Sequence, residues 1–350
     1  MKSRRRIYPI FLSHAGCPFR CVYCDQKKIA FQSPSGAPSK DVLDHCRKEL
    51  SALKRAHTPG KGPMEVAFYG GTFTALPEQL LQQILELAKP LVKEGVLSGI
   101  RFSTRPDSIN SRICDLLEKY PVQTVELGVQ SFDDQVLANS HRGHGSLAVY
   151  EAVDHIRSRG WAVGIQLMLG LPGDGPERFL RSVREAALLH ADLVRFYPVV
   201  VLEGTTLAQW YRNGIYKPLG LEEAIHWCVP AFDHLVQRGN PPVRMGLQAD
   251  ASLEKPGTIL AGPYHPAFGY LVRVAWWRQR VDDSLADGIP CSSREAILTV
   301  RVPKRLLSEV VGPNRMNIHH WVRTWSLAQV QVAGVDSWEG FNFELGWSPL

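Results

Sequence analysis

The chain has 350 residues, of which 45% are hydrophobic and 21% are charged, and these proportions exclude a disordered protein. Its formal net charge is +6, and residues 1–30 account for all of it, because residues 31–350 hold equal numbers of acidic and basic side chains. The charge therefore gives no sign of a nucleic-acid-binding surface that covers the whole protein. The sequence has no apolar run of about 18 residues and no apolar leader, so we expect no membrane span and a cytoplasmic location.

Short apolar segments alternate with helical patterns along the first part of the chain. The predicted strands are 7–13, 64–69, 99–104, 122–128, 162–169 and 192–200. The predicted helices are 39–56, 76–94, 108–119, 133–158, 176–190 and 218–238. This alternation is typical of a parallel sheet with crossover helices. Six such units predict an α/β fold with a partial (β/α)6 barrel, in which functional residues follow the carboxyl ends of the strands.

The pattern loosens after residue 200, and residues 295–333 read as strand, helix and strand. We expect a main domain over residues 1–245 and a smaller C-terminal α+β region over residues 246–350. Residues 273–323 carry a net charge of +4. Four tryptophans lie in the same stretch: Trp276, Trp277, Trp321 and Trp325. Arginines and tryptophans together indicate either a stacking surface for single-stranded RNA or a tryptophan-rich core with solvated arginines.

Three of the seven cysteines, Cys17, Cys21 and Cys24, lie within eight residues, directly after the first predicted strand. In a chain without a secretion signal, such a group indicates a metal or cluster site rather than disulfides. Three thiolates from one loop can hold three irons of a [4Fe–4S] cluster, and the remaining iron is then open to a ligand. The alternative is a zinc site of three cysteines and His14 in a non-catalytic interaction protein.

The loops after the later predicted strands carry further polar and glycine motifs. They are Gly70-Gly71-Thr72, Ser103-Thr104-Arg105, Gly128-Val129-Gln130-Ser131, Ser140-His141-Arg142-Gly143-His144 and, within the fifth strand, Gln166. Paired glycines after a strand let a ligand approach the backbone closely. Each of these residues also has an interpretation that involves no ligand. The glycines could form a tight turn, Arg105 a surface ion pair, and Glu126 and Gln130 could be solvated side chains. Met168 could occupy a core position and His144 a surface loop.

Together these motifs resemble the radical S-adenosylmethionine (SAM) enzymes, whose signature is Cys-x3-Cys-x2-Cys with an aromatic residue before the last cysteine, here Tyr23. The resemblance implies that the three cysteines bind a [4Fe–4S] cluster and that its open iron binds SAM. An electron from the cluster would cleave SAM to a 5′-deoxyadenosyl radical, which takes a hydrogen atom from the substrate. The implied SAM contacts are Tyr23, Gly70, Gly71, Thr72, Ser103, Gln130, Arg142 and Gln166. His144 is a candidate proton donor.

Several stretches are similar to the elongator catalytic-subunit family, namely those at 70–77, 103–107, 125–131, 141–144 and 195–205. This similarity implies modification of a tRNA base, uridine 34. We do not expect that family's acetyltransferase domain in the 105 residues of the C-terminal region, where no glycine-rich CoA-binding loop occurs. A more distant resemblance to oxygen-independent coproporphyrinogen oxidase implies a small-molecule substrate as the alternative. Both reactions need an external one-electron donor such as flavodoxin or ferredoxin.

Overall fold

The computed structural model describes residues 6–12, 15–25, 39–58, 62, 64–248, 253–288 and 296–349. The chain forms two compact units, each made of two separate stretches. The first unit comprises Met1–Gly220 and Pro242–Tyr264, and the second comprises Leu221–Pro241 and His265–Leu350. The predicted boundary between residues 245 and 246 falls inside the second stretch of the first unit.

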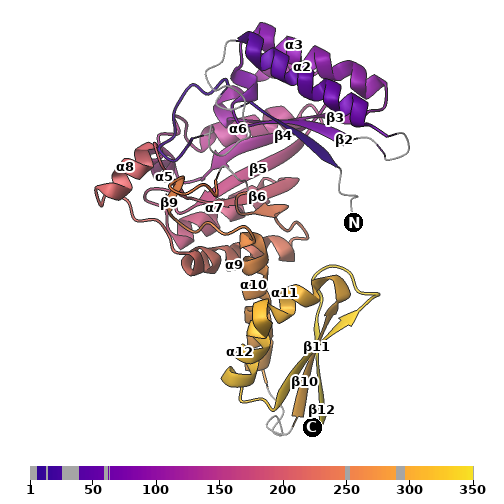
Figure 1. Cartoon of the computed structure of the whole chain (residues 1–350), viewed down its shortest axis with the longest axis vertical. Helices are drawn as coiled ribbons and strands as arrows, with labels where there is room; N and C mark the ends of the chain where they lie inside the picture. Colours follow the sequence, from indigo (N-terminus) through magenta and orange to yellow (C-terminus); the bar gives the residue numbers. More distant parts are fainter. Residues whose placement is uncertain are drawn as a thin grey trace. The chain divides into compact units, whose positions relative to one another are not determined.

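The first unit is built on a seven-stranded sheet in the order β1-β2-β3-β4-β5-β6-β8, and all neighbouring strands are parallel. The strands are β1 (Ile7–Phe11), β2 (Met64–Tyr69), β3 (Leu97–Thr104), β4 (Val122–Gln130), β5 (Ala162–Leu169), β6 (Leu193–Pro198) and β8 (Arg244–Met245). The sheet curls into a partial barrel (Figure 1), which confirms the predicted fold. The sequence pattern does not predict β8, because two residues show no periodicity.

Helices cover the outer face of this sheet (Figure 1). They include α2 (Ser39–Ala56), α3 (Glu78–Lys93) and α7 (Pro176–Leu188). Of the other helices, α4 (Ser111–Leu117) follows β3, and α8 (Thr206–Arg212) follows β7. In α3 the fully buried residues Leu81, Ile84 and Ala88 recur every three or four positions and form one apolar face. A separate two-stranded antiparallel sheet joins β7 (Val201–Leu202) and β9 (Ile259–Ala261).

The single helix predicted over 133–158 is wrong. The chain forms α5 (Asp134–Asn139) and α6 (Leu147–Arg157), with a loop between them. Two residues of this loop, His141 with φ 55° and Gly143 with φ 75°, adopt the left-handed conformation, which a right-handed α-helix cannot contain. Because of this break, Arg142 lies in a loop rather than in a helix, and it lines the cavity of the first unit.

Strand alternation gives the sheet an apolar outer face and a polar inner face. On β2, Val66 and Phe68 are fully buried on the outer face, and Glu65 and Tyr69 alternate with them on the inner face. Other inner-face residues are Arg101 on β3, Glu126 on β4, Gln166 on β5 and Arg195 on β6. Parallel sheets are normally apolar on both faces, so a polar interior indicates where the fold holds a functional site.

The second unit combines helices with a small mixed sheet. Its helices are α9 (Leu221–Gln237), α10 (Phe268–Ala286), α11 (Leu307–Val311) and α12 (Met316–Thr324). In the sheet, β10 (Ala296–Pro303) pairs in parallel with β11 (Gln329–Val335) and antiparallel with β12 (Glu344–Pro349). None of the helices described in either unit is both long enough and apolar enough to traverse a membrane.

Tryptophans form the core of the second unit. Trp276, Trp277 and Trp321 are each exposed by 1% or less. Trp325 is half-buried, and its indole nitrogen donates a hydrogen bond to Asp282 Oδ1 at 2.7 Å. Nucleic-acid bases cannot stack on buried indoles. The RNA-stacking surface predicted for this stretch is therefore wrong for Trp276, Trp277 and Trp321, and the alternative of a tryptophan-rich core is correct for them.

Candidate functional site

The carboxyl ends of the strands in the first unit open into a cavity of about 590 Å³. This volume lies in the range of about 300–1,000 Å³ that is usual for ligand pockets. Every residue that the resemblance assigns to the cluster or to SAM lines the cavity: Cys17, Cys21, Cys24, Tyr23, Gly70, Gly71, Thr72, Ser103, Gln130, Arg142 and Gln166. His144 is not among the lining residues. His14, the fourth ligand of the zinc alternative, lies outside the described residues.

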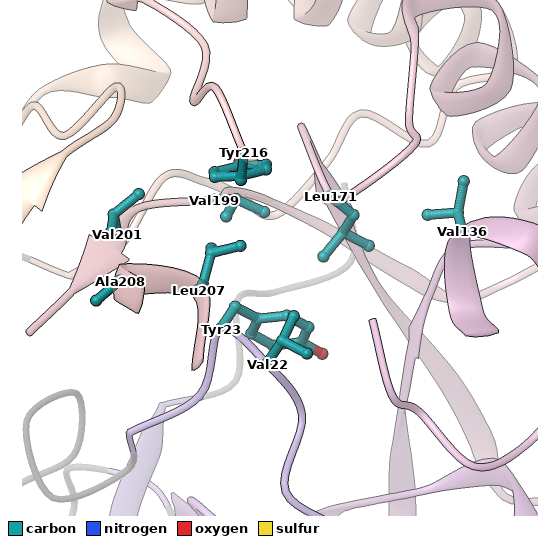
Figure 2. Packing of buried hydrophobic residues seen from close by; sticks show 9 residues of the cluster. All are labelled: Val22, Tyr23, Val136, Leu171, Val199, Val201, Leu207, Ala208 and Tyr216. Atoms are coloured by element: carbon teal, nitrogen blue, oxygen red, sulfur yellow. The ribbon is translucent and has the colours of Figure 1, made fainter. Parts of the chain in front are cut away.

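The cysteine loop, residues 17–24, packs against a buried apolar cluster. Val22 and Tyr23 of this loop are buried, and Figure 2 shows them packed near Leu207 of α8. Two backbone hydrogen bonds fix the same turn. The nitrogen of Val22 donates to the carbonyl of Ser140 at 3.2 Å, and the nitrogen of Leu207 donates to the carbonyl of Val22 at 2.8 Å. Val22 and Tyr23 occupy the apolar cluster, whereas the three cysteines of the same loop remain partly exposed and line the cavity.

The residues directly before the cysteine loop, Ala15 and Gly16, lie in close backbone contact with the loop after β2. The nitrogen of Thr72 donates to the carbonyl of Ala15 at 2.9 Å, and Cys17 Sγ lies 3.3 Å from Thr72 Oγ1. A Cβ on Gly16 would lie 2.3 Å from the Thr72 carbonyl, and one on Gly71 would lie 2.2 Å from the Ala15 carbonyl. Only glycine permits this approach. Gly71 therefore has a structural role beside the SAM-binding role that the resemblance predicts for it.

Arg142 joins the cysteine loop to β4. It is 6% exposed, its Nη1 donates to Cys21 Sγ at 3.2 Å, and its Nη2 donates to the carbonyl of Gly128. Burial and the positive charge of Arg142 lower the pKa of His144 to about 4, so this imidazole is neutral at pH 7. Its Nε2 lies 3.3 Å from Arg142 Nη2 and its Nδ1 lies 3.1 Å from the carbonyl of Gly145. This geometry favours His144 as a support for Arg142 over the predicted proton donor.

Gln130 lies at an irregularity of β4 and has a φ of 71°. The pairing with β5 shifts its register between Gly128 and Gln130. A non-glycine residue held in this conformation costs about 1–3 kcal/mol. The Oε1 atom of Gln130 is buried and has no hydrogen-bond partner in the described part of the chain. A buried acceptor without a partner costs about 1–3 kcal/mol more, so a ligand that donates to this oxygen would be favoured.

A network of four charges crosses the inner face of the sheet nearer the amino ends of the strands. We call Glu65, Arg101, Glu126 and Arg195 the lumen network. Arg101 Nη1 lies 3.0 Å and Arg195 Nε lies 2.9 Å from Glu126 oxygens, and Arg101 Nε lies 2.9 Å from Glu65. The Tyr69 hydroxyl donates to Glu126 at 2.7 Å. Burial raises the pKa of Glu126, but the two guanidinium charges outweigh burial and hold that pKa below its ordinary value.

Sequence reasoning missed the lumen network, and its interpretation of Glu126 as a solvated side chain is wrong, because Glu126 is 1% exposed. The available signal was a charged residue at an inward position on several neighbouring strands. Gln166 also contacts the network, since its Nε2 donates to Glu126 Oε2 at 3.0 Å. Met168 is half-buried, packs against the same apolar cluster as Val22 and Tyr23, as expected of a core position, and also lines the cavity.

Arg105 forms the ion pair predicted for it, but the pair is not at the surface. Its Nε and Nη2 lie 2.9 and 2.8 Å from the two carboxylate oxygens of Asp107. Arg105 is 5% exposed and also donates to the carbonyl of Arg142. Its guanidinium carbon lies 4.9 Å from the centre of the Phe19 ring. These contacts hold the loop after β3 against the cysteine loop.

The donor set fits a [4Fe–4S] cluster. Three thiols from one loop provide three of the four ligands of a cubane cluster, and each thiolate binds a different iron. In the part of the chain that the structure describes, no three His, Cys, Asp or Glu side chains are arranged to hold a single metal ion. A cubane cluster does not require such an arrangement. The buried, unpartnered oxygen of Gln130 on the same cavity fits a second bound group.

Comparison with known proteins agrees with this geometry. Residues 12–186 match the Radical SAM superfamily, and residues 191–277 match the Radical SAM C-terminal domain. A tRNA uridine(34) acetyltransferase of Dehalococcoides mccartyi is 29% identical over 232 residues, which are 58% of this chain and 50% of that protein. The heme chaperone HemW of Bacillus subtilis is 26% identical over 212 residues, which are 59% of this chain and 55% of that protein. The chain thus spans about half the length of each relative.

A solved structure shares the fold. The archaeal Methanocaldococcus infernus Elp3 with an N-terminal deletion matches this chain with a TM-score of 0.59 at 20% sequence identity. The match covers 89% of this chain and 69% of that one. At this level of identity the likeness concerns the fold alone.

Proposed function

The chain belongs to the radical SAM superfamily, and from this premise we propose that it is an enzyme that modifies an RNA, with a tRNA uridine as the first candidate. Members of this superfamily bind a [4Fe–4S] cluster and SAM. In this chain Cys17, Cys21 and Cys24 would hold the cluster. When bound, the cluster supplies the electron that cleaves SAM, and the 5′-deoxyadenosyl radical so formed removes a hydrogen atom from the substrate.

The observation that carries the proposal is the shared cavity of the three cysteines and the SAM motifs. Arg142 lies beside Cys21, and its Nη1 donates a hydrogen bond to Cys21 Sγ at 3.2 Å. The same arginine ties the cysteine loop to β4 and so fixes the distance between the cysteines and Gln130. The buried acceptor of Gln130, which has no partner among the described residues, supports its proposed role as a contact of SAM.

The choice of RNA as substrate is supported by the similarity to the tRNA uridine(34) acetyltransferase and by the elongator-like motifs. A cavity of about 590 Å³ can admit one unstacked base but not a duplex. This limit agrees with the way proteins read RNA, which is mostly through splayed bases of single-stranded loops. The alternative is a small-molecule substrate, and the similarity to HemW agrees with it only in that this relative, a heme chaperone, is named for a small molecule. Both readings include an external one-electron donor such as flavodoxin or ferredoxin.

Anaerobic reconstitution tests the cluster. We expect about four irons and four sulfides per wild-type chain, as a cubane cluster requires, and loss of both from Cys21→Ala. Cys46→Ala is the matched control, because Cys46 is a buried thiol of α2 outside the cavity. Zinc without sulfide in the wild-type protein would instead support the zinc-binding interaction protein.

Formation of 5′-deoxyadenosine by the reduced holoprotein, with and without bulk tRNA, tests the substrate. Stimulation by tRNA supports the RNA proposal and justifies mapping of the modified nucleoside. Cleavage of SAM that is indifferent to tRNA supports a small-molecule substrate. A full cluster without any cleavage contradicts the assignment of the SAM site.

A further inference from the structure

Two inward-facing arginines are neighbours at the edge of the sheet in the first unit. Strands β6 and β8 pair in parallel with Arg195 opposite Arg244, and both residues line the cavity. Paired residues on adjacent parallel strands project from the same face. Like charges at such neighbouring positions repel each other and destabilise the sheet unless a counter-charge compensates them.

The described carboxylates do not compensate this pair. The lumen network is balanced within itself, since its two carboxylates pair with its two arginines, and Glu126 is the partner of Arg195. Arg244 adds a third positive charge to the same face. Its Nη1 donates to the neutral Gln248 Oε1 at 2.9 Å, and it has no ion pair with any residue that the structure describes. One positive charge on the described inner face is therefore unmatched.

The surroundings of the two arginines suit an anion. Tyr197 lines the same part of the cavity and offers a hydroxyl group. The Arg195 guanidinium lies 5.9 Å from the centre of the ring of Tyr69, whose own hydroxyl already donates to Glu126. None of the described residues that line the cavity is an aspartate or a glutamate. An anion at this place would thus meet hydrogen-bond donors and no facing carboxylate.

We propose that Arg195 and Arg244 recognise an oxyanion, a phosphate or a carboxylate, that the substrate of the radical reaction carries. The inference rests on the proposed function, because it concerns the substrate of that reaction. A guanidinium group matches both kinds of oxyanion with two parallel hydrogen bonds. The ion pair with Glu126 fixes the position of the Arg195 side chain. Arg244, on the neighbouring strand, provides the positive charge that has no carboxylate partner among the described residues. Anchored in this way, the substrate lies in the same cavity as the cysteine loop.

Arg244→Gln is the informative variant. Removal of Arg195 would leave the buried Glu126 short of a partner and would confound folding with recognition. Arg244 is only half-buried and lies on a two-residue strand, so its replacement spares the fold. Arg184→Gln is the matched control, because it removes the same charge from an exposed position of α7 outside the cavity. Arg244→Lys keeps the charge and loses the two-pronged geometry.

Isothermal titration calorimetry of the reconstituted holoprotein with inorganic phosphate and with malonate, at constant ionic strength, is the test. We expect an anion to bind wild-type protein and to bind Arg244→Gln about tenfold more weakly or worse, as loss of a charge-assisted hydrogen bond implies. Arg244→Lys should fall between them, and Arg184→Gln should match the wild type. Binding of phosphate alone points to a phosphorylated substrate such as a nucleotide, and binding of malonate alone points to a carboxylate.

Equal affinity of wild type and Arg244→Gln, or failure of both anions to bind, overturns the inference. The same preparations are assayed for SAM cleavage without substrate. Absence of cleavage contradicts the proposed function whatever the anions do, so the two failures are distinguishable. Intact cleavage in Arg244→Gln together with weakened anion binding is the result that supports a site for the substrate rather than for SAM.

Discussion

Glu126→Gln removes one buried negative charge and keeps the size of the side chain. Glu126 is 1% exposed and pairs with Arg101 at 3.0 Å and with Arg195 at 2.9 Å. After the change Arg101 still has Glu65, but Arg195 loses the carboxylate with which it pairs in the described structure. We therefore expect a guanidinium that is only 13% exposed and has no counter-charge, which is a costly arrangement.

The magnitude follows from these distances. At charge centres about 4 Å apart and an effective dielectric constant of about 20, each pair contributes about 4 kcal/mol of Coulomb energy. Desolvation offsets much of this energy in the intact network, but breaking a buried pair costs about 3–5 kcal/mol. A glutamine can still accept the hydrogen bond of Tyr69, so we expect the lower value, about 3 kcal/mol. Domains are stable by only about 5–15 kcal/mol, so this loss is readily measured.

The sign of the pH dependence is a second expectation for the same variant. The arginines hold the pKa of Glu126 below its ordinary value in the folded protein. The unfolded chain therefore binds a proton at this side chain before the folded chain does. The stabilisation by Glu126 is complete above the ordinary pKa of a glutamate. It is lost as the pH falls from that value through the lowered pKa of the folded protein. Below about pH 5 the wild type should thus lose more free energy of unfolding than Glu126→Gln.

Urea unfolding of the apo protein, followed by circular dichroism, gives the free energies. Arg195→Met, alone and combined with Glu126→Gln, completes a double-mutant cycle. The double variant no longer contains the unpaired guanidinium, so it should be more stable than Glu126→Gln by about 1 kcal/mol or more. Glu177→Gln, on the exposed first turn of α7, should change the stability by less than about 0.5 kcal/mol. A cost below about 1 kcal/mol for Glu126→Gln, or strict additivity in the cycle, would refute the reasoning.

Three other changes test the cavity. Gly71→Ala places a Cβ 2.2 Å from the Ala15 carbonyl, so the variant should lose most of its iron on reconstitution, whereas Gly175→Ala, with nothing within 4 Å, should keep it. Equal iron contents would contradict the close contact. Gln130→Gly relieves a φ of 71°, so the melting temperature of the apo protein should rise while its affinity for SAM, measured by calorimetry after reconstitution, falls. A lower melting temperature would show that the strain is absent. His144 should titrate with a pKa of about 4 in NMR spectra of the imidazole rings. Because the unfolded chain binds this proton near pH 6.5, the free energy of unfolding should decrease as the pH falls from about 6.5 to about 4. An imidazole that titrates near its ordinary pKa would contradict the contact with the arginine.

The strands and the site motifs could be predicted because both are local patterns. The six predicted strands are short apolar runs, and the motifs at Cys17, Gly71 and Gln130 follow where a run ends. Since the carboxyl ends of parallel strands meet at one edge, Cys17, Gly71 and Gln130 could be expected in one place without knowledge of the contacts. The loop between α5 and α6 was not predicted, because apolar spacing continues on both sides of it. Gly143 was the available signal for the break.

Side-chain direction explains what the sequence pattern did not predict. A tryptophan near arginines has the same composition whether it stacks on a base or fills a core, and only packing places Trp276 and Trp277 inside. Glu126 likewise resembles any polar residue near a strand end. Its role depends on Arg101 and Arg195, which come from other strands and are brought to it by the curl of the sheet. Such long-range pairs have no local signature.

The lumen network needs an explanation other than stability. Buried ion pairs are often no more stabilising than apolar side chains of the same volume, because desolvation cancels the attraction. Within the network, Glu65 fixes Arg101, both arginines fix Glu126, and Glu126 fixes Arg195. Arg195 is the member that lines the cavity, directly beside Arg244. A rigidly held guanidinium recognises an oxyanion with less loss of side-chain entropy than a mobile one does. The cost of burying four charges is then explained by recognition of the substrate.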